Sequence, residues 1–324
     1  MNIIVLFVFC VGLASAKNIL RYSLEDARDH FENFIQDYNK EYDEEEKAVR
    51  YEIFVKNLEK INSLNENSDG AVFAINKFSD LTSEEFIQRH TGYIRSNVSG
   101  ACINSGDLDL KPVDVPEEFD WRQKRVVTEV KNQICGSCWA FSAIGTVESA
   151  YAIKTNQLVD LSEQELIDCE KKSYGCRSGN PETALKYIQD NGAMTEDDYP
   201  YEARDGMCRL NPQKVKVRVK NCVKVQAKED EFAEKLLQLG PLSIVVDGET
   251  VQHYNGGILK ECRGININHA VLLVGYGKGE DGKPYWLVKN SWGADWGENG
   301  YFKMPRGVNC AFVADQPPLG VVIA

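Results

Sequence analysis

Two cysteines three positions apart lie in the sequence Gln133-Ile134-Cys135-Gly136-Ser137-Cys138-Trp139-Ala140-Phe141. This spacing fits a structural zinc half-site, a redox pair, or a nucleophile beside a structural cysteine. Zinc requires a second pair of Cys or His ligands at similar spacing, which the sequence lacks. A thioredoxin-like redox pair requires a strand before the motif, whereas residues 126–131 form only a short, charged run. We therefore favour a nucleophile and retain a thiol–disulfide oxidoreductase as an alternative.

Cys138 lies where the sequence predicts the start of a helix, because apolar residues follow at helical spacing at Phe141, Ile144 and Val147. The positive end of a helix dipole favours a thiolate at that position. A nearby imidazolium would lower the pKa of the thiol further, from about 8.5 towards ~3–4. Cys138 is therefore the candidate nucleophile.

A nucleophilic cysteine needs a basic partner, and the sequence has only 4 histidines. His30 and His90 lie in the N-terminal third, which we expect to be removed. His253 lies in a polar segment, and we interpret it as a surface or packing residue. His269 precedes an apolar, strand-like run, so we expect it at the edge of a strand. On its own such a histidine is usually structural, but beside Cys138 it is the candidate acid/base partner.

Charge and composition restrict the class of protein. Lys plus Arg number 37 against 49 Asp plus Glu, so the formal net charge is −12, and no long basic run occurs. Binding to nucleic acid depends on neutralising its phosphates with basic side chains, and this sequence lacks a long basic run for that purpose. We therefore exclude nucleic acid as a partner. An odd number of cysteines follows residue 16. Their abundance is typical of an oxidising compartment, and their odd number predicts at least one free thiol.

The first 16 residues predict a secretory signal peptide. Residues 3–13 form an apolar run that is followed by the small-x-small cleavage pattern Ala14-Ser15-Ala16. The run is shorter than the roughly 20 residues that span a bilayer, so we expect no stable membrane anchor. We place the protein in the secretory pathway, acting in a lysosome-like compartment or outside the cell. Asn97 begins an acceptor triplet for an N-linked glycan.

Composition changes predict a helical N-terminal segment at residues 17–112 and a working domain at residues 113–324. Apolar and aromatic residues repeat at helical spacing in the first segment. Residues 96–115 show no periodicity and are rich in Gly, Ser, Asp and Pro, which is typical of an exposed linker that proteases cut. In the working domain, Ser162 and Asn180 are expected to cap two helices, and Gly192 to end the second of them. Apolar, β-branched or aromatic runs follow at residues 242–246, 270–276 and 285–289 and predict strands. The fold class is therefore α+β, with two lobes and a cleft between them.

Four motifs together resemble those of the papain family of cysteine proteases, in its cathepsin L-like branch. The nucleophile segment quoted above is the first, and residues 268–271 resemble the family's histidine segment. The third resembles the family's final catalytic element and runs from Asn290 to Gly297. The fourth is the interspersed signature of cathepsin L-type propeptides, made of Glu46, Arg50, Phe54, Asn57, Ile61 and Asn65, with residues 75–80 after it. Within the family the sequence is most similar to virus-encoded cathepsins of insect baculoviruses.

This resemblance implies a two-lobed papain-like fold, with a helical lobe, a β-barrel-like lobe and a helical propeptide that acts as an intramolecular inhibitor. It implies an endopeptidase that is made as a zymogen, hydrolyses protein and peptide substrates as a monomer, and needs neither a metal nor a cofactor. Acidification is expected to loosen the propeptide as carboxylates become protonated. The similarity to viral cathepsins implies the breakdown of host tissue proteins during infection.

The family's catalytic roles carry over to residues at matching positions. Cys138 is expected to form a thioester with the substrate, and His269 to act as acid and base. Asn290 is expected to orient His269, and Trp292 to shield their hydrogen bond from water. Gln133 and the backbone N–H of Cys138 are expected to form the oxyanion hole. The family usually has two residues between this glutamine and the next cysteine, whereas only one is present here. We expect the backbone to adjust, and retain a catalytically impaired binding protein as an alternative.

The resemblance also implies disulfides and a substrate pocket. The implied disulfides are Cys135–Cys176, Cys169–Cys208 and Cys262–Cys310. We expect Cys102 to be lost with the propeptide and Cys222 to be a buried small hydrophobe. The residues expected to line the substrate are Gly179, Asn180, Pro181, Val245, Ala270, Asp315 and Trp292. A carboxylate from Asp315 at the pocket floor would admit Arg or Lys as well as Leu or Phe, and the alternative is an exposed C-terminal acid.

Overall fold

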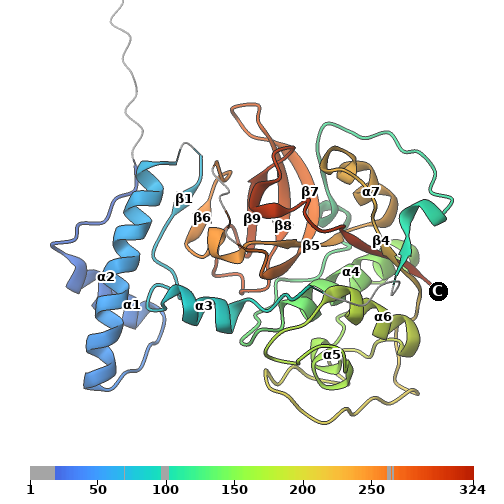
Figure 1. The fold of residues 1–324 in the computed structure, drawn as a ribbon, viewed down its shortest axis with the longest axis horizontal. Helices are drawn as coiled ribbons and strands as arrows, with labels where there is room; N and C mark the ends of the chain where they lie inside the picture. Colours follow the sequence, from blue (N-terminus) through green and yellow to red (C-terminus); the bar gives the residue numbers. More distant parts are fainter. Residues whose placement is uncertain (1–18, 69, 96–101, 261–263, 265) are drawn as a thin grey trace, which may run out of the picture.

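The computed structural model describes residues 19–68, 70–95, 102–260, 264 and 266–324 (Figure 1). The predicted signal peptide, Asn97 and Cys262 lie outside these residues. Figure 1 shows the N-terminal helices at one side of a larger domain, in which strands fill one lobe and a group of helices fills the other. Within the described ranges, no helix is long and apolar enough to cross a membrane.

The N-terminal segment folds into α1 (Ala27–Asp37), α2 (Glu44–Glu66), β1 (Val72–Phe73) and α3 (Ser83–His90). Phe31 and Phe34 of α1 pack against Phe54 and Leu58 of α2 in a small core of their own. This packing is what the repeats at helical spacing predicted. The carboxylate of Asp43 caps the N-terminus of α2 and so satisfies one of its free backbone N–H groups.

The polar residues of the signature on α2 hold this segment together. Asn65 binds both backbone groups of Phe73, because its Nδ2 donates to the carbonyl and its Oδ1 accepts from the N–H, each at 2.8 Å. Arg50 pairs with Glu85 at 2.7 Å and so connects α3 to α2. The apolar Ile61 is fully buried and belongs to the same core as the strand lobe. The signature therefore both shapes the segment and docks it.

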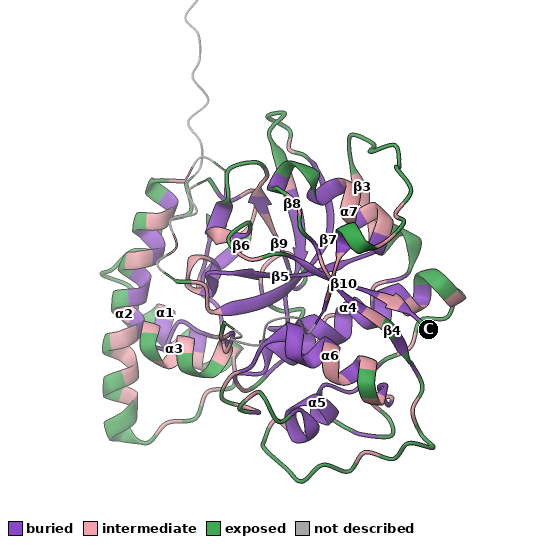
Figure 2. Ribbon diagram, turned by 45° about the vertical axis from the view of Figure 1, so that its right-hand side comes forward, coloured by how far each residue is buried: buried purple, intermediate pink, exposed green. Residues whose placement is uncertain are grey.

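The helical lobe consists of α4 (Cys138–Thr155), α5 (Glu163–Cys169) and α6 (Pro181–Asn191). Most of α4 is buried, whereas α1, α2 and α3 each expose one face to solvent (Figure 2). The side chains of Ser162 and Asn180 cap α5 and α6 by accepting from Glu165 N and Glu182 N. Gly192 ends α6 with a φ of 85°, a conformation that favours glycine. The caps and the stop are at the positions that the sequence predicted.

The strand lobe belongs to an eight-stranded sheet with the order β2-β4-β10-β5-β7-β8-β9, and β3 pairs with β7. The strands are β2 (Ile103–Asn104), β3 (Phe119–Asp120), β4 (Val219–Lys224), β5 (Leu242–Val246), β7 (His269–Lys278), β8 (Pro284–Lys289), β9 (Tyr301–Pro305) and β10 (Leu319–Ile323). The runs predicted as strands at 242–246, 270–276 and 285–289 coincide with β5, β7 and β8. β5 and β7 are antiparallel, with Val245 opposite Ala270 and Val246 opposite His269.

The remaining elements connect these parts. They are α7 (Phe232–Leu239), β6 (Tyr254–Gly256) and the 3-10 helices η1 (Ser105–Asp107), η2 (Trp121–Lys124), η3 (Glu229–Glu231), η4 (Gly248–Val251) and η5 (Cys310–Phe312). β1 of the N-terminal segment pairs with β6 in a separate two-stranded sheet. This pairing attaches the N-terminal segment to the strand lobe.

The structure corrects the predicted states of Cys102 and Cys222, because the two residues are joined by a disulfide. Cys222 is buried, as predicted, but it is not a free thiol. The partners are 120 positions apart in the sequence. They meet only because β2, directly after Cys102, pairs with β4 of the sheet. The residues from Cys102 onward are therefore attached to the larger domain.

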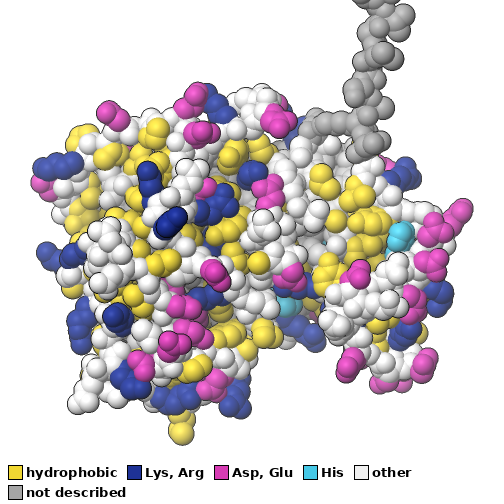
Figure 3. Space-filling model, turned by 180° about the vertical axis from the view of Figure 1, so that it is seen from behind, with side chains coloured by type: hydrophobic (Ala, Val, Ile, Leu, Met, Phe, Trp, Pro, Cys, Tyr) yellow, Lys and Arg dark blue, Asp and Glu magenta, His cyan; other side chains and the backbone are white. Residues whose placement is uncertain are grey.

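The surface carries charges of both signs. On the face that Figure 3 shows, basic and acidic side chains lie interspersed, with hydrophobic side chains between them. Some exposed charges pair, as Arg21 does with Glu66 at 3.0 Å and Lys214 with Asp198 at 2.7 Å. Exposed pairs of this kind contribute only about 0–1 kcal/mol each. The fold therefore depends on its buried core and disulfides rather than on these pairs.

Candidate active site

Cys138 is the first residue of α4 and the only free cysteine in the described part of the protein. Its side chain is fully buried, packs with Tyr93, Val245 and Ala270, and accepts a hydrogen bond from Ala270 N at 3.4 Å. Burial raises the pKa of the Cys138 thiol to about 12, because a thiolate would lose its hydration there. The thiol is therefore protonated as long as Tyr93 of the N-terminal segment covers it.

His269 is the first residue of β7. The next residue, Ala270, donates the hydrogen bond to Cys138, which places His269 beside the thiol. Its Nε2 lies 2.8 Å from Asn290 Oδ1, which also accepts from Ser291 N at 2.8 Å. Both contacts identify Oδ1 as the acceptor, so we assign the imidazole proton to Nε2. Nδ1 makes no hydrogen bond to any residue that the structure describes. It is therefore the nitrogen left to exchange a proton with the thiol.

Trp292 covers the hydrogen bond between His269 and Asn290. Its fully buried ring stacks on the imidazole, with centroids 4.6 Å apart and planes 22° apart. Burial lowers the pKa of His269 to about 4, although the hydrogen bond that His269 donates to Asn290 acts in the opposite direction. Desolvation of Cys138 likewise outweighs the helix dipole that favours a thiolate. Both partners are therefore uncharged at neutral pH while the site is covered.

Residues 92–94 of the N-terminal segment cover the site by hydrogen-bonding to both of its walls. Gly179 N donates to Gly92 O at 2.8 Å, and Ile94 N donates to Gly179 O at 2.9 Å. From the other wall, Asn268 O accepts from Tyr93 N at 2.8 Å. Gly179 precedes α6 in the helical lobe, whereas Asn268 precedes β7 in the strand lobe. The backbone groups of Gly179 that were predicted to bind a substrate are thus occupied by the protein itself.

Gly179 has to lack a side chain, because a Cβ there would come within 2.4 Å of Trp139 Cδ2. The glycine that the resemblance requires at this position is therefore also required by packing. The next residue, Asn180, donates from Nδ2 to Ile94 O at 2.7 Å as well as capping α6. Pro181 is buried as the first residue of α6. All three predicted residues of this wall lie next to the covering segment or directly behind it.

The opposite wall contains only part of the predicted pocket. Val245 and Ala270 face each other across β5 and β7 and pack on Cys138. Asp315 is exposed, and its Oδ1 accepts from Asn309 Nδ2 at 2.7 Å. Among the described contacts, none joins Asp315 to the residues around Cys138. Its place at the pocket floor therefore stays a prediction.

Gln133 is buried, and its side chain reaches the covered site despite the shortened loop. Its Nε2 donates to the carbonyl of His90 at 3.2 Å, and Trp292 Nε1 donates to the same carbonyl at 2.9 Å. Its Oε1 accepts from Ser291 Oγ at 2.5 Å. Because Trp292 stacks on His269, the bound carbonyl lies next to the His269–Asn290 pair. The missing residue has therefore not turned Gln133 away from the site.

Tyr201 supports the shortened loop, and no sequence motif pointed to it. Its hydroxyl accepts from Ile134 N at 3.2 Å and lies 3.2 Å from Ser137 Oγ. Its ring meets Phe141 of α4 edge-on, with centroids 5.2 Å apart. Because Tyr201 lies 67 positions after Ile134, only the folded structure relates the two. Tyr201 is the residue that ties the loop after Gln133 to the start of α4.

Gln133→Ala is expected to lower kcat by ~10²–10³, because one donor to the developing oxyanion is lost. KM is expected to change little, since this donor acts mainly in the transition state. Steady-state hydrolysis of a fluorogenic peptide by the activated enzyme measures both constants. Gln123→Ala, at an exposed position in η2, is the matched control and should leave them unchanged. An unchanged kcat in Gln133→Ala would contradict the assigned role.

Cys135 is bonded to Cys176, which leaves Cys138 without a disulfide partner. This pairing is the one that the resemblance implied, and it opposes a redox pair made of Cys135 and Cys138. Among the described residues, no group of three or more His, Cys, Asp or Glu side chains could hold a metal ion.

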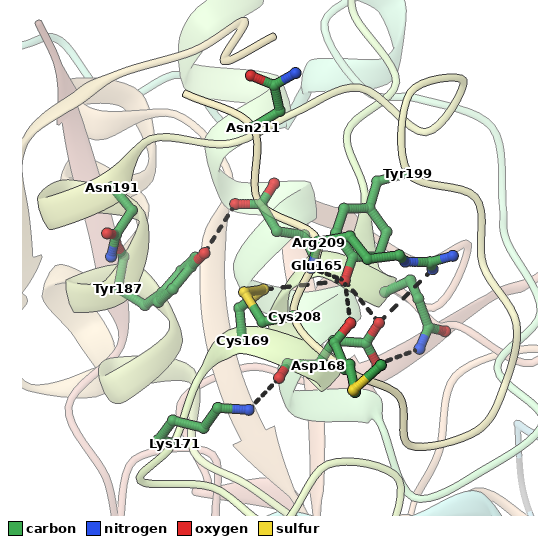
Figure 4. The surroundings of a disulfide bond; sticks show 12 residues. Glu165, Asp168, Cys169, Lys171, Tyr187, Asn191, Tyr199, Cys208, Arg209 and Asn211 are labelled. Carbon is green, nitrogen blue, oxygen red and sulfur yellow. Dashed lines mark hydrogen bonds and ion pairs between the residues drawn. A yellow bond between two sulfur atoms is a disulfide. The ribbon is translucent and has the colours of Figure 1, made fainter. Parts of the chain in front are cut away.

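The Cys169–Cys208 disulfide, which the resemblance also implied, lies in a partly buried polar network at the end of α5 (Figure 4). Tyr199 donates its hydroxyl to Asp168 Oδ2 at 2.7 Å and accepts from Arg209 N at 3.1 Å. The disulfide and this network together hold the loop that contains Tyr199 against α5. Cys310 is also disulfide-bonded, and its implied partner, Cys262, lies outside the described residues.

The N-terminal segment is anchored on the ring that covers the catalytic pair. Phe78 and Phe86 meet Trp292 edge-on, with centroids 5.5 and 5.2 Å away. The His90 ring packs against Phe78 with centroids 4.6 Å apart and planes tilted by 48°, and burial lowers the pKa of His90 to about 3. His253 is buried rather than at the surface, and burial also lowers its pKa to about 3. The N-terminal segment contributes to this burial, because Ala74 N donates to the carbonyl of His253 at 3.0 Å.

The site combines a buried thiol at a helix start with an imidazole that an asparagine orients, and the N-terminal segment covers both. These features define the class as a cysteine peptidase held in precursor form. Residues 115–318 match the papain family cysteine protease domain, and residues 31–86 match the cathepsin propeptide inhibitor domain. The chain belongs to the papain family of cysteine proteases. It is made as a zymogen with a cathepsin-type propeptide.

Individual relatives agree with this assignment. The protein is 42% identical over 322 residues to a viral cathepsin of Antheraea pernyi nuclear polyhedrosis virus, and the alignment covers 98% of both sequences. It is 44% identical over 293 residues to a viral cathepsin of Mamestra configurata nucleopolyhedrovirus, covering 89% of this sequence and 87% of the relative. Digestive procathepsin L2 of Tenebrio molitor larval midgut has a similar structure, with a TM-score of 0.83 and 35% identity, covering 91% of this protein and 99% of the other.

Proposed function

We propose that Cys138 attacks the carbonyl carbon of a peptide bond while His269 Nδ1 takes the thiol proton and then passes it to the leaving amine. The acyl group stays on Cys138 as a thioester until a water molecule, deprotonated by His269, hydrolyses it. Gln133 Nε2 and the N–H of Cys138 stabilise the oxyanion. The observation that carries this proposal is the free thiol beside the His269–Asn290 pair beneath Trp292.

Acid is proposed to release the propeptide, because its contacts favour uncharged histidines. His90 and His253 have a pKa of about 3 in the closed precursor, against an ordinary value of 6.5. The open form therefore binds protons more readily, and the closed form loses stability as the pH falls below about 6.5. Arg50 lowers the pKa of Glu85 in the closed form, so protonation of this carboxyl acts in the same direction. Acidic vesicles or an acidified extracellular space are the compartments that this behaviour suits.

The proposed substrates are proteins of host tissue, by analogy with the viral cathepsins to which the protein is similar. Asp315 is proposed to lie at the floor of the pocket for the residue two before the cut. In that position its carboxylate would pair with a substrate Arg or Lys. The apolar Val245 and Ala270 would accept Leu or Phe in the same pocket.

Hydrolysis of paired Leu-Arg and Arg-Arg fluorogenic peptides by acid-treated, thiol-reduced protein tests the function and the pocket together. Both peptides should be cleaved, and conversion of the precursor should accelerate below about pH 6.5. Asp315→Ala should lower cleavage of Arg-Arg by about tenfold or more relative to Leu-Arg. Asp281→Ala, at an exposed turn, is the control and should leave the ratio unchanged.

Other outcomes of this experiment separate the remaining alternatives. An unchanged ratio in Asp315→Ala would place the carboxylate outside the pocket and leave the peptidase assignment intact. Absence of hydrolysis together with rapid alkylation of Cys138 would indicate that the shortened loop impairs the oxyanion hole. Absence of both would favour a protein that only binds its partners.

A further inference from the structure

The Cys102–Cys222 disulfide joins the linker that follows the propeptide to the sheet of the peptidase domain. Cys222 lies in β4 and is fully buried, and Cys102 directly precedes β2 and is also buried. Both side chains belong to the core of the helical lobe. The bond is therefore part of the folded interior of the domain rather than a link across its surface.

Backbone pairing fixes the residues just after Cys102 to the same domain. β2 lies parallel to β4, with Ile103 opposite Val223. Gln226, which follows β4, donates from its backbone N to Ser105 Oγ at 3.2 Å and from Nε2 to Asn104 Oδ1 at 3.0 Å. The beginning of the linker thus forms an edge strand of the peptidase sheet.

Apolar contacts continue this attachment up to Leu110. Leu108 and Leu110 pack against the core of the strand lobe. Leu110 also lines a hollow together with Ile153 of α4 and Leu237 of α7. At its end, Lys111 O accepts from Gln238 Nε2 at 2.8 Å. Residues 102–110 are therefore held by a covalent bond, a strand pairing and apolar packing.

Residues 111–118, by contrast, are all exposed. Exposed loop segments are the sites at which proteases cut most readily. A cut there breaks the backbone on the C-terminal side of Cys102. The contacts described above lie on the N-terminal side of the cut, and the sulfur–sulfur bond is untouched.

We propose that residues 102–110 are a permanent part of the catalytic domain, and that without a reductant only a cut N-terminal to Cys102 frees the active site. A cut at residues 111–118 alone would leave a two-chain form with the propeptide tethered through Cys102–Cys222. A tether of this kind keeps the inhibitor at an effective concentration of about 1 mM, so it rebinds after each opening. Release from the two-chain form would require a thiol reductant that supplies two electrons to the disulfide. The inference rests on the proposed function, in which residues 92–94 block the cleft.

Two versions of the precursor test this proposal, each with a recognition sequence for an added site-specific protease. One has the sequence at residues 112–115, and the other has it directly before Cys102. After cutting without reductant, the first should migrate as one species that separates only when reduced. At acidic pH and about 1 µM protein, an epoxide probe should label Cys138 of the first version at least about tenfold more slowly than Cys138 of the second. The largest expected difference is about 10³-fold, which is the ratio of the effective concentration of the tethered propeptide to the protein concentration.

The matched control carries Cys102→Ser and Cys222→Ser in the version cut at residues 112–115. It should separate without reduction and label as fast as the version cut before Cys102. Equal labelling of all three cut proteins would overturn the proposal. If the version cut before Cys102 is not labelled at all, the proposed catalytic role of Cys138 fails instead.

Mass mapping of the unaltered protein gives a second test that needs no variant. Active enzyme formed by self-processing should begin upstream of Cys102 and should yield a peptide containing Cys102 linked to one containing Cys222. Active enzyme that begins after Leu110 and contains no residue 102 would contradict the proposal, whatever the behaviour of the engineered versions.

Discussion

Cys138→Ala is expected to lower peptide hydrolysis by about 10⁶, because removal of the nucleophile abolishes the acyl-enzyme route. The precursor should also stay uncut at acidic pH if processing is autocatalytic. The expectation follows from position as well as chemistry, since Cys138 is the only free cysteine described and lies beside His269. Fluorogenic hydrolysis and electrophoresis of the acid-treated precursor measure the two effects.

Two further variants separate loss of the nucleophile from loss of the fold. Cys138→Ser keeps the shape of the side chain but offers a weaker nucleophile, so it should be nearly as inactive. Ser149→Ala lies in the same helix, and the Ser149 hydroxyl makes no hydrogen bond to any described residue. This control should process and hydrolyse normally. Substantial hydrolysis by Cys138→Ala would place the nucleophile elsewhere.

A cluster of buried carboxylates around the partly exposed Lys131 is the basis of the second large effect. Lys131 Nζ lies 2.8 Å from Glu163 Oε1, 3.2 Å from Glu148 Oε1 and 2.5 Å from Asp160 Oδ1, and it donates to the carbonyl of Leu161 at 3.0 Å. The carboxylates of Glu148 and Glu163 are almost completely buried. Burial raises the pKa of Glu163 to about 8, although Lys131 opposes the shift. Lys131 is the cation that both carboxylates contact directly, and the buried Lys289 also interacts electrostatically with both.

Lys131→Met is expected to lower the free energy of unfolding by about 3–5 kcal/mol near neutral pH, because Glu148 and Glu163 stay buried and lose the cation that they contact directly. The loss should be larger at about pH 9. Lys131 opposes the rise in the pKa of Glu163 to about 8, so its removal should raise that pKa further. The folded variant would then hold the Glu163 proton at a pH where the unaltered protein has released it, so the difference in stability grows as the pH rises above about 8. Urea unfolding in the Cys138→Ala background measures stability without self-digestion.

Lys186→Met provides the comparison for this variant. Lys186 pairs with Asp190 one turn later on the surface of α6, and such a pair contributes about 0.3–0.5 kcal/mol. The effect of its removal should be small at both about pH 7 and about pH 9. The account of the buried cluster is wrong if Lys131→Met behaves like Lys186→Met at both pH values.

Local signals predicted much of this fold because they act over a few residues. Ser162 and Asn180 cap helices that begin at the next residue, and Gly192 ends one of them. The apolar runs at 242–246 and 285–289 are strands. In each case the residues that decide the element lie within it or next to it.

Contacts between distant segments could not be predicted from the sequence in the same way. The resemblance brought Cys138, His269 and Asn290 together, but nothing in the spacing of Cys102 and Cys222 predicts that they meet across 120 positions. β4, which contains Cys222, and its neighbour β10 lacked a sequence pattern strong enough to predict them. Tyr201 likewise supports the loop at Ile134 only because tertiary packing places its hydroxyl there.

His253 shows the limit of a local interpretation of polarity. Its neighbours in the sequence are polar, which suggested a surface or packing position. The structure buries it completely, because the strand lobe lies on one side and the propeptide covers the other. Burial of this kind depends on a segment more than 170 positions away, since Asn76 Nδ2 donates to the carbonyl of the preceding residue, Gln252, at 2.8 Å.

Labelling with an epoxide probe, followed by peptide mapping, tests the central claim most directly. In the intact precursor at neutral pH the Cys138 thiol is buried, with a pKa of about 12, so labelling should be very slow. After acid activation, one adduct per molecule should form quickly, and the mapped residue should be Cys138. An adduct on any other residue, no adduct after activation, or equally fast labelling of the intact precursor would contradict a propeptide-covered cysteine nucleophile.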